Sequence, residues 1–162
     1  MAEETGVEFR VNDEPSLPRF AALNQRWIET YHHMEESDLE MVRDPGLYVR
    51  NGGRVITAHI FDGGGDGEVA GAVALKPHSD GRWELTKMAV DPAFHGRGIG
   101  GKLLEEAHRV AREELGLSEL FLLTNTVLEA AQRLYLRHGW VVNHEGAHPI
   151  YQRCNIGYLK VL

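Results

Sequence analysis

Residues 83–115 read WELTKMAVDPAFHGRGIGGKLLEEAHRVAREEL, and this stretch predicts a strand, a glycine-rich turn and an amphipathic helix. Residues 83–90 are rich in apolar and β-prone side chains, and Pro92 ends the strand because proline cannot donate to a strand ladder. From Ile99 onward, apolar residues recur at helical spacing opposite a charged face, and Gly116 is suited to stop the helix.

The glycine-rich turn is suited to binding an anion. A helix start leaves its first backbone N–H groups unpaired and carries a partial positive charge. Glycines remove the side chains that would keep a phosphate at a distance, and Arg97 and Lys102 add formal charge nearby. We therefore expect a diphosphate to lie on the amides of residues 96–102, although a loop that only turns the chain has the same composition.

Two common phosphate-binding patterns fit this turn poorly. Gly96, Gly98 and Gly101 satisfy G-x-G-x-x-G, but the dinucleotide fingerprint follows its strand tightly and precedes a strand that ends in an acidic residue. Here residues 91–94 intervene, and the next strand ends at Thr124. The phosphate loop of nucleotide triphosphatases fails as well, because no Gly-Lys-Ser/Thr follows the glycines.

The same turn resembles the acyl-CoA-binding motif [Q/R]-x-x-G-x-[G/A] of the Gcn5-related N-acetyltransferase (GNAT) family. Residues 95–100, HGRGIG, match both glycine positions, while His95 stands where the family has glutamine or arginine. A second family segment, N-x(n)-A-x-x-L-Y-x-x-x-G-[F/W], is matched by Asn125 together with residues 130–140. Two independent motifs in the right order make the resemblance specific, and it covers about residues 55–140.

The apolar pattern itself predicts an α/β chain of alternating elements. We expect strands at about residues 7–11, 54–61, 68–76, 83–90, 119–124, 140–143 and 156–162, and helices at about 17–31, 38–43, 99–115 and 127–138. Capping-box patterns begin at Ser37 and Thr126, and residues 62–67 predict a flexible hairpin loop.

The resemblance implies one GNAT-like acyl-CoA N-acyltransferase domain over residues 1–162. Its fold is mixed α+β, with a central, mostly antiparallel sheet and helices on both faces. Strands 83–90 and 119–124 are joined by a helical crossover, so they should be parallel neighbours. In the family, this parallel pair splays apart at the cofactor.

Composition excludes several classes of function. The 162 residues, 43% of them apolar, can bury the core of one domain, and the net charge of −7 argues against nucleic acid as a partner. No stretch approaches the roughly 20 apolar residues that span a bilayer, and the acidic start does not look like a signal peptide. The single Cys154 suits a reducing compartment. We expect a cytoplasmic protein without membrane partners, and a homodimer as the commonest oligomer.

The resemblance also implies a cofactor, acetyl-CoA, and residues that bind it. Pantetheine would pair with the backbone of residues 88–90, and the pyrophosphate would lie on the glycine-rich turn. Asn125 would bond the pantetheine or thioester region, although an N-cap is the alternative. The expected cofactor-binding residues are Met88, Ala89, Val90, His95, Gly96, Arg97, Gly98, Ile99, Gly100, Gly101, Lys102 and Asn125.

Two residues are candidates for acid–base chemistry in attack of an amine on the thioester. An alkyl amine, with a pKa of roughly 10.4, must lose a proton, directly or through water. Glu84 is the candidate base, because strand alternation gives it the same side as Met88 and Val90. Tyr135 holds the position of the family's general acid, and a phenol keeps its proton at neutral pH. The alternatives are a locally bonded strand glutamate and a core aromatic.

The acceptor side is less defined. His32 and Glu35 lie where the family forms a wall of the acceptor site, and a solvated helix end is the alternative. We expect no metal site there, because further ligands at suitable spacing are missing. Cys154 lacks a histidine-plus-acid partner for nucleophilic catalysis, and the tail around it, Y-x-R-C-N-I at residues 151–156, is similar to a segment of one acetyltransferase subgroup.

Three functions therefore remain open. The first is N-acetylation of a primary amine on a small molecule or peptide, with the acceptor (amino acid, polyamine, aminoglycoside or peptide N-terminus) and the length of the acyl group undefined. The second is a non-catalytic acyl-CoA sensor on the same scaffold. The third, a nicotinamide-dependent reductase, requires a nucleotide pocket at the glycine-rich turn.

Overall fold

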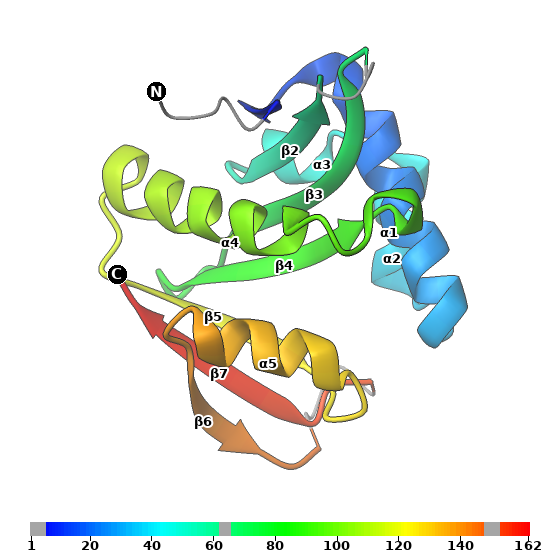
Figure 1. The fold of residues 1–162 in the computed structure, drawn as a ribbon. Helices are drawn as coiled ribbons and strands as arrows, with labels where there is room; N and C mark the ends of the chain where they lie inside the picture. Colours follow the sequence, from blue (N-terminus) through cyan, green and yellow to red (C-terminus); the bar gives the residue numbers. More distant parts are fainter. Residues whose placement is uncertain (1–5, 62–65, 148–152) are drawn as a thin grey trace.

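A computed structural model describes residues 6–61, 66–147 and 153–162 of the chain. These residues form a sheet in the order β1-β2-β3-β4-β5-β7-β6, with helices on both faces (Figure 1). The elements in chain order are β1 (Val7–Val11), η1 (Glu14–Ser16), α1 (Leu17–Tyr31), α2 (Glu36–Arg43), α3 (Leu47–Arg50), β2 (Arg54–Ile60), β3 (Glu68–Pro77), β4 (Trp83–Val90), η3 (Pro92–Phe94), α4 (Ile99–Arg109), η4 (Val110–Glu114), β5 (Glu119–Thr124), α5 (Glu129–Arg137), β6 (Val141–Glu145) and β7 (Ile156–Val161).

The expected fold class is confirmed. The strands pair antiparallel throughout, apart from β4 and β5, which are parallel as the crossover through α4 requires. Parts of two expected segments, residues 62–65 of the hairpin loop and residues 151 and 152 of the tail, lie outside the described residues. Within the described residues, no helix is long and apolar enough to cross a membrane.

Two expected helix starts are wrong. Helix α2 begins two residues earlier than the Ser37 pattern predicts, because Glu35 is its N-cap and the Glu35 N–H donates to Asp38 Oδ2 at 2.9 Å. Helix α5 begins only at Glu129, and the Thr126 hydroxyl instead accepts a hydrogen bond from the Asn155 amide. At Thr126 the competing partner, Asn155, is distant in sequence, whereas α2 uses a capping box of Glu35 and Asp38 two residues before the expected one.

The sheet separates two layers of core. Helices α4 and α5 cover one face, where the buried cluster includes Leu103, Leu104, Tyr135 and Trp140. Helices α1 and α2 cover the other face, with Phe20 and Met41 among the buried side chains. The small residues of β3, Val69 to Ala74, let both helical layers approach the sheet closely.

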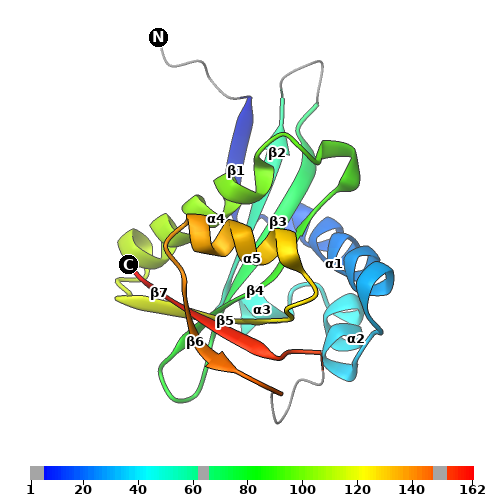
Figure 2. The ribbon, with the colours of Figure 1, turned by 60° about the horizontal axis from the view of Figure 1, so that its bottom comes forward.

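Strands β4 and β5 diverge almost as soon as they meet. Their ladder holds a single pair of partners, Glu84 and Phe121, so the two strands separate toward their carboxyl ends (Figure 2). The β3–β4 ladder shifts register at the same level, and Lys87 takes a positive φ of 56°. A bulge in β4 therefore adds to the opening beside β5.

This bulge overturns the expected strand alternation. Thr86 pairs with Ala74 and Ala89 pairs with Ala72, so Thr86 and Ala89 lie on one face although three residues separate them. Glu84 shares that face, whereas Met88 and Val90 pack into the core on the α4 side. The expectation that Glu84 points to the same side as Met88 is wrong, because the alternation of a strand ends at a bulge.

Gly71 on β3 allows the close contact between the sheet and α4. A Cβ at this position would lie 2.8 Å from Leu103 Cδ1 and 3.2 Å from the Ala89 carbonyl oxygen. We expect Gly71→Val to lower the free energy of unfolding by about 1–3 kcal/mol, because the buried contact cannot widen without moving α4. Urea denaturation measures the change. Glu68→Gln, at the exposed start of the same strand, is the control, and equal midpoints for the two variants would contradict this packing argument.

Candidate active site

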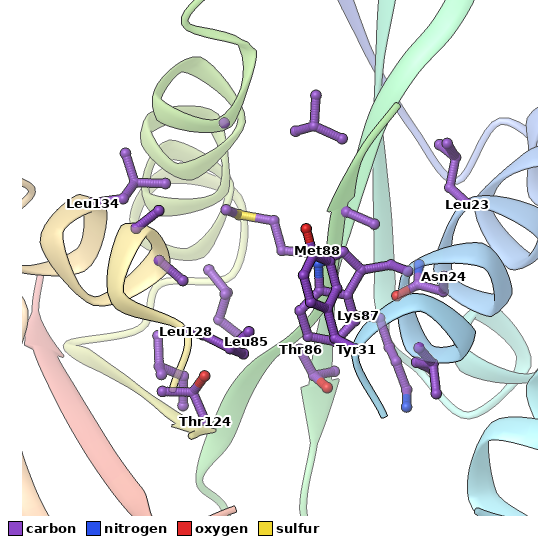
Figure 3. Close-up of a pocket in the computed structure, with 18 of the residues that line it drawn as sticks. Leu23, Asn24, Tyr31, Leu85, Thr86, Lys87, Met88, Thr124, Leu128 and Leu134 are labelled. Carbon is purple, nitrogen blue, oxygen red and sulfur yellow. The ribbon is translucent and has the colours of Figure 1, made fainter. Parts of the chain in front are cut away.

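A cavity of about 560 Å³ occupies the space where β4 and β5 separate. Its size is that of an ordinary small-molecule site. Figure 3 shows it between two groups of side chains, with Leu128 and Leu134 on one side of β4 and Leu23, Asn24 and Tyr31 on the other. The cavity thus runs from the start of α4, past the open edge of β4, to the side of the sheet covered by α1.

At one end of the cavity, several backbone N–H groups lack an acceptor in the described main chain. Within the described residues, the N–H groups of Gly96, Gly98, Ile99, Gly100 and Gly101 donate to no backbone carbonyl, and the first such bond of α4 is Lys102 N–H to Gly98 O. All five residues line the cavity. The start of α4 therefore offers a cluster of amides at the positive end of a helix dipole.

Glycine is required at two positions of this turn. Gly96 and Gly98 have φ values of 78° and 75°, which side-chain-bearing residues rarely adopt. A Cβ at either position would meet no atom within 4 Å, so it would stand in open space. The turn is therefore shaped for an anion that approaches the backbone directly.

The side chains predicted to add charge around the turn differ in their surroundings. Arg97 and Lys102 are not among the residues that line the cavity, and the Arg97 guanidinium lies 5.6 Å from the Phe94 ring centre. The His95 ring reaches back to strand β4, where its Nε2 bonds the Val90 carbonyl oxygen at 3.2 Å. Of these three residues, His95 is the one that lines the cavity, and the expected contacts of Arg97 and Lys102 with a pyrophosphate stay predictions.

Glu84 lies in the wall of the cavity, and its carboxylate is hydrogen-bonded to a histidine. It is 6% exposed, and its Oε1 accepts a hydrogen bond of 2.8 Å from His78 Nε2. The His78 ring packs beside Phe121, with 5.2 Å between the ring centres. Sequence reasoning missed His78, because a histidine in the turn before β4 carries no pattern that links it to the strand. The carboxylate and the imidazole together form an acid–base pair at the cavity wall.

Tyr135 contributes a phenol from the opposite side. Its ring packs against Trp140 and Tyr158, with ring centres 6.1 and 5.7 Å apart. Burial, with a smaller effect of Tyr158, raises the pKa of Tyr135 to about 12. No hydrogen bond joins the hydroxyl to another described residue, and Tyr135 lines the cavity. It is therefore a protonated donor without an internal acceptor.

The aromatic stack behind Tyr135 is held by a neutral histidine. Trp140 Nε1–H donates to His108 Nε2 at 3.0 Å, which requires that nitrogen to be unprotonated. Burial lowers the pKa of His108 to about 4. The neutral imidazole thus fixes the indole against which Tyr135 packs.

Asn125 lies at the cavity but its side chain is engaged. Its amide nitrogen donates to the Arg153 carbonyl at 2.8 Å, and its side-chain oxygen accepts from the Val127 N–H at 2.9 Å. These bonds join the end of β5 to the segment that leads into β7. The expected contact with pantetheine stays a prediction that these local bonds do not favour.

On the side of the sheet that α2 covers, Asp38, Lys87 and Arg153 form a buried ionic cluster. Arg153 donates to both carboxylate oxygens of Asp38, at 2.6 and 2.8 Å, and Lys87 Nζ donates at 2.5 Å. Burial would raise the pKa of Asp38, but these bonds outweigh it and lower the pKa far below its usual value. The cluster joins α2, the bulge of β4 and the segment before β7, three parts of the chain that are distant in sequence (Figure 2).

His32 and Glu35 lie at this side with different surroundings. His32 lines the cavity and stacks on Trp27, with 5.6 Å between the ring centres, and burial together with Arg153 lowers its pKa. Glu35 is not among the lining residues and lies 4.0 Å from Arg153. Among the described residues, no three potential metal ligands come together.

Cys154 also lines the cavity. Burial raises the pKa of its thiol to about 11, so the group is protonated at neutral pH and is a poor nucleophile.

Comparison with known proteins agrees with this arrangement. Residues 20–140 match the sequence profile of the acetyltransferase (GNAT) family. The chain belongs to the GNAT acetyltransferase family. Its sequence is 32% identical over 132 residues to N-acetylaspartate synthetase of Homo sapiens. The aligned region covers 77% of this chain but only 38% of the human protein.

Solved structures of GNAT proteins share the fold at low sequence identity. A GNAT acetyltransferase from Staphylococcus aureus Mu50 aligns with a TM-score of 0.79 and 18% identity, over 96% of this chain and 99% of its own. An acetyltransferase from Streptococcus agalactiae 2603 gives 0.75 and 20%, over 97% and 99%. Spermidine N-acetyltransferase from Vibrio cholerae, solved with CoA and spermine, gives 0.70 and 17%, over 96% and 94%.

Gly98, which precedes α4, and Gly116, which follows η4, offer a matched test of the glycine-rich turn. Gly98 and Gly116 both have positive φ, 75° and 66°, and both face open space. Alanine at either position carries a similar strain of about 1–2 kcal/mol. We expect Gly98→Ala to weaken acetyl-CoA binding at least tenfold in calorimetry, because Gly98 lines the cavity, and Gly116→Ala to bind normally because Gly116 does not. Equal affinities of the two variants would exclude the turn as the binding site.

The ionic cluster predicts a strong and pH-dependent effect on stability. We expect Asp38→Asn to lower the free energy of unfolding by about 3–5 kcal/mol at neutral pH, because Lys87 and Arg153 lose their shared partner. The folded pKa of Asp38 is lowered, so its contribution is complete above the unfolded value near 4 and is lost as the pH falls further. Urea denaturation should therefore show a smaller difference in the free energy of unfolding between Asp38→Asn and the unaltered protein at pH 3 than at pH 7.

Asp80→Asn, at an exposed pair with Arg82, is the control and should leave the midpoint almost unchanged at both pH values. If Asp38→Asn lowered the free energy of unfolding by the same amount at both pH values, the electrostatic explanation would be contradicted.

Proposed function

We propose that this protein transfers the acetyl group of acetyl-CoA to a primary amine of a small molecule or peptide. The observation that carries the proposal is the cluster of amides at the start of α4 whose N–H groups donate to no backbone carbonyl of the described residues. This cluster lies at the gap between β4 and β5. A row of amides over bare glycines fits a pyrophosphate, and an open strand edge fits the amide groups of pantetheine. The family match supports both.

The groups at the cavity fit the two ends of such a cofactor. The amides of residues 96–102 would hold the pyrophosphate, and residues 88–90 would pair with the pantetheine arm. The thioester would then lie beyond the open edge of β4, between the face that carries Glu84 and the side that carries Tyr135. Acetyl-CoA supplies an activated acyl group there.

The chemistry is attack of the amine on the thioester carbonyl. A C–N bond forms, the C–S bond breaks, and the amine gives up a proton. Glu84, bonded to His78, accepts that proton directly or through water. The Tyr135 hydroxyl, which is hydrogen-bonded to no other described residue, donates to the departing thiolate. A protein that only sensed acyl-CoA would not need these two groups on opposite sides of the cleft.

The names of the compared proteins include an amino acid, in N-acetylaspartate synthetase, and a polyamine, in spermidine N-acetyltransferase. Both are primary amines, so the reaction class is the same for either acceptor.

Substitution of the two acid–base groups tests the proposal. We expect Glu84→Gln and Tyr135→Phe each to lower kcat on the order of 10²-fold or more, because each removes proton transfer but keeps the shape of the side chain. Acetyl-CoA affinity, measured by calorimetry, should stay within a fewfold of the unaltered protein.

Tyr158→Phe is the matched control for the phenol. Its hydroxyl donates to Gln132 away from the reaction, and its ring belongs to the same aromatic stack. We expect near-normal turnover for this variant. Unchanged turnover in both Glu84→Gln and Tyr135→Phe would refute the catalytic roles, and tight acetyl-CoA binding without turnover of any amine would favour a sensor.

A further inference from the structure

The cavity has the opposite charge to the protein as a whole. The chain has a net charge of −7, yet Glu84 is the one acidic residue among the described residues that line the cavity. The basic residues in the same lining are Arg26, Lys76, Lys87, Arg137 and Arg153. Phosphates of a nucleotide cofactor account for positive charge near α4, but Lys87 and Arg153 lie on the other side of β4, beside α2.

Asp38 cannot serve as a site for a cationic substrate. It is completely buried, and its two oxygens already accept hydrogen bonds from Arg153, Lys87 and the Glu35 N–H. It is not among the residues that line the cavity. Its role is to hold two cations side by side at the cavity wall.

The two cations keep unused donors. A guanidinium has five N–H groups and an ammonium has three, and Asp38 takes two from Arg153 and one from Lys87. Both residues line the cavity, and their side chains are 19% and 9% exposed. Such partly buried donors, already fixed in place, bind a carboxylate more strongly than flexible surface cations do.

We propose that the acceptor is an amine that carries a carboxylate, as an α-amino acid does, and that Arg153 and Lys87 receive this carboxylate. The inference rests on the proposed acetyl transfer. Glu84, the acid of the lining, then faces the amino group, so the two charged ends of the substrate meet charges of opposite sign. A polyamine would place several positive charges beside two cations that a buried carboxylate holds in position.

A panel of acceptors tests the inference without any substitution. The unaltered protein is assayed with acetyl-CoA and matched pairs that differ by the carboxylate, phenylalanine against phenethylamine and alanine against alanine methyl ester, together with spermidine. We expect kcat/KM at least tenfold higher for the better amino acid than for its carboxylate-free or esterified counterpart and for spermidine. Equal or better use of the amines without a carboxylate would overturn the proposal.

Substitution of Arg153 tests the assigned residue. We expect Arg153→Gln to raise KM for the best amino acid at least tenfold, with little change in KM for phenethylamine or in acetyl-CoA affinity. Arg43→Gln, which removes an exposed guanidinium from α2, is the control and should leave all three values unchanged. An unchanged KM for the amino acid in Arg153→Gln would overturn the role of Arg153.

Two further readouts keep the outcomes separate. If Arg153→Gln does not fold, Arg153→Lys retains the charge beside Asp38 but loses the forked geometry, and its KM should still rise. Failure to bind acetyl-CoA, or to acetylate any amine, overturns the proposed function and this inference together. Turnover confined to amines without a carboxylate overturns this inference alone.

Discussion

The structure depends on an incomplete pairing in its own sheet. Strands β4 and β5 are neighbours in the strand order, but they share one pair of partners and then separate. Buried backbone groups without partners are costly, so a protein keeps such a gap only where water or a ligand satisfies them. The bulge at Lys87 and the crossover through α4 widen the gap and place the helix start at its mouth. The site exists because the sheet is left open there.

The ionic cluster is the counterpart of this opening on the acceptor side. A sheet that lacks hydrogen bonds between two central strands needs other contacts to hold its halves in register. Asp38 on α2, Lys87 on β4 and Arg153 before β7 supply such a contact between the two halves. The bulge at Lys87, which breaks the alternation of β4, also turns that side chain toward α2. The bulge at Lys87 thus shapes both the open edge of β4 and the ionic cluster.

Much of the fold could be predicted because it is encoded locally. The glycines of the turn, the helical spacing after Ile99 and the apolar run of β5 each specify one element within a few residues. The missed features are those that depend on distant partners. Neither the bulge at Lys87 nor the pairing of His78 with Glu84 leaves a periodic signal. The capping role of Glu35 was missed for a similar reason, since Asp38 serves the helix and the ion cluster at once.

The order of Asp38, Lys87 and Arg153 along the chain has a consequence for biosynthesis. Residues are added from the amino end, so the aspartate and the lysine leave the ribosome before the arginine. Until then the nascent chain carries a carboxylate and an ammonium that meet without the guanidinium that completes the cluster. The glycine-rich turn and α4 also precede Arg153 in the sequence. Because Arg153 is the last of the three to be synthesised, we expect the ionic cluster to be completed among the last steps of folding.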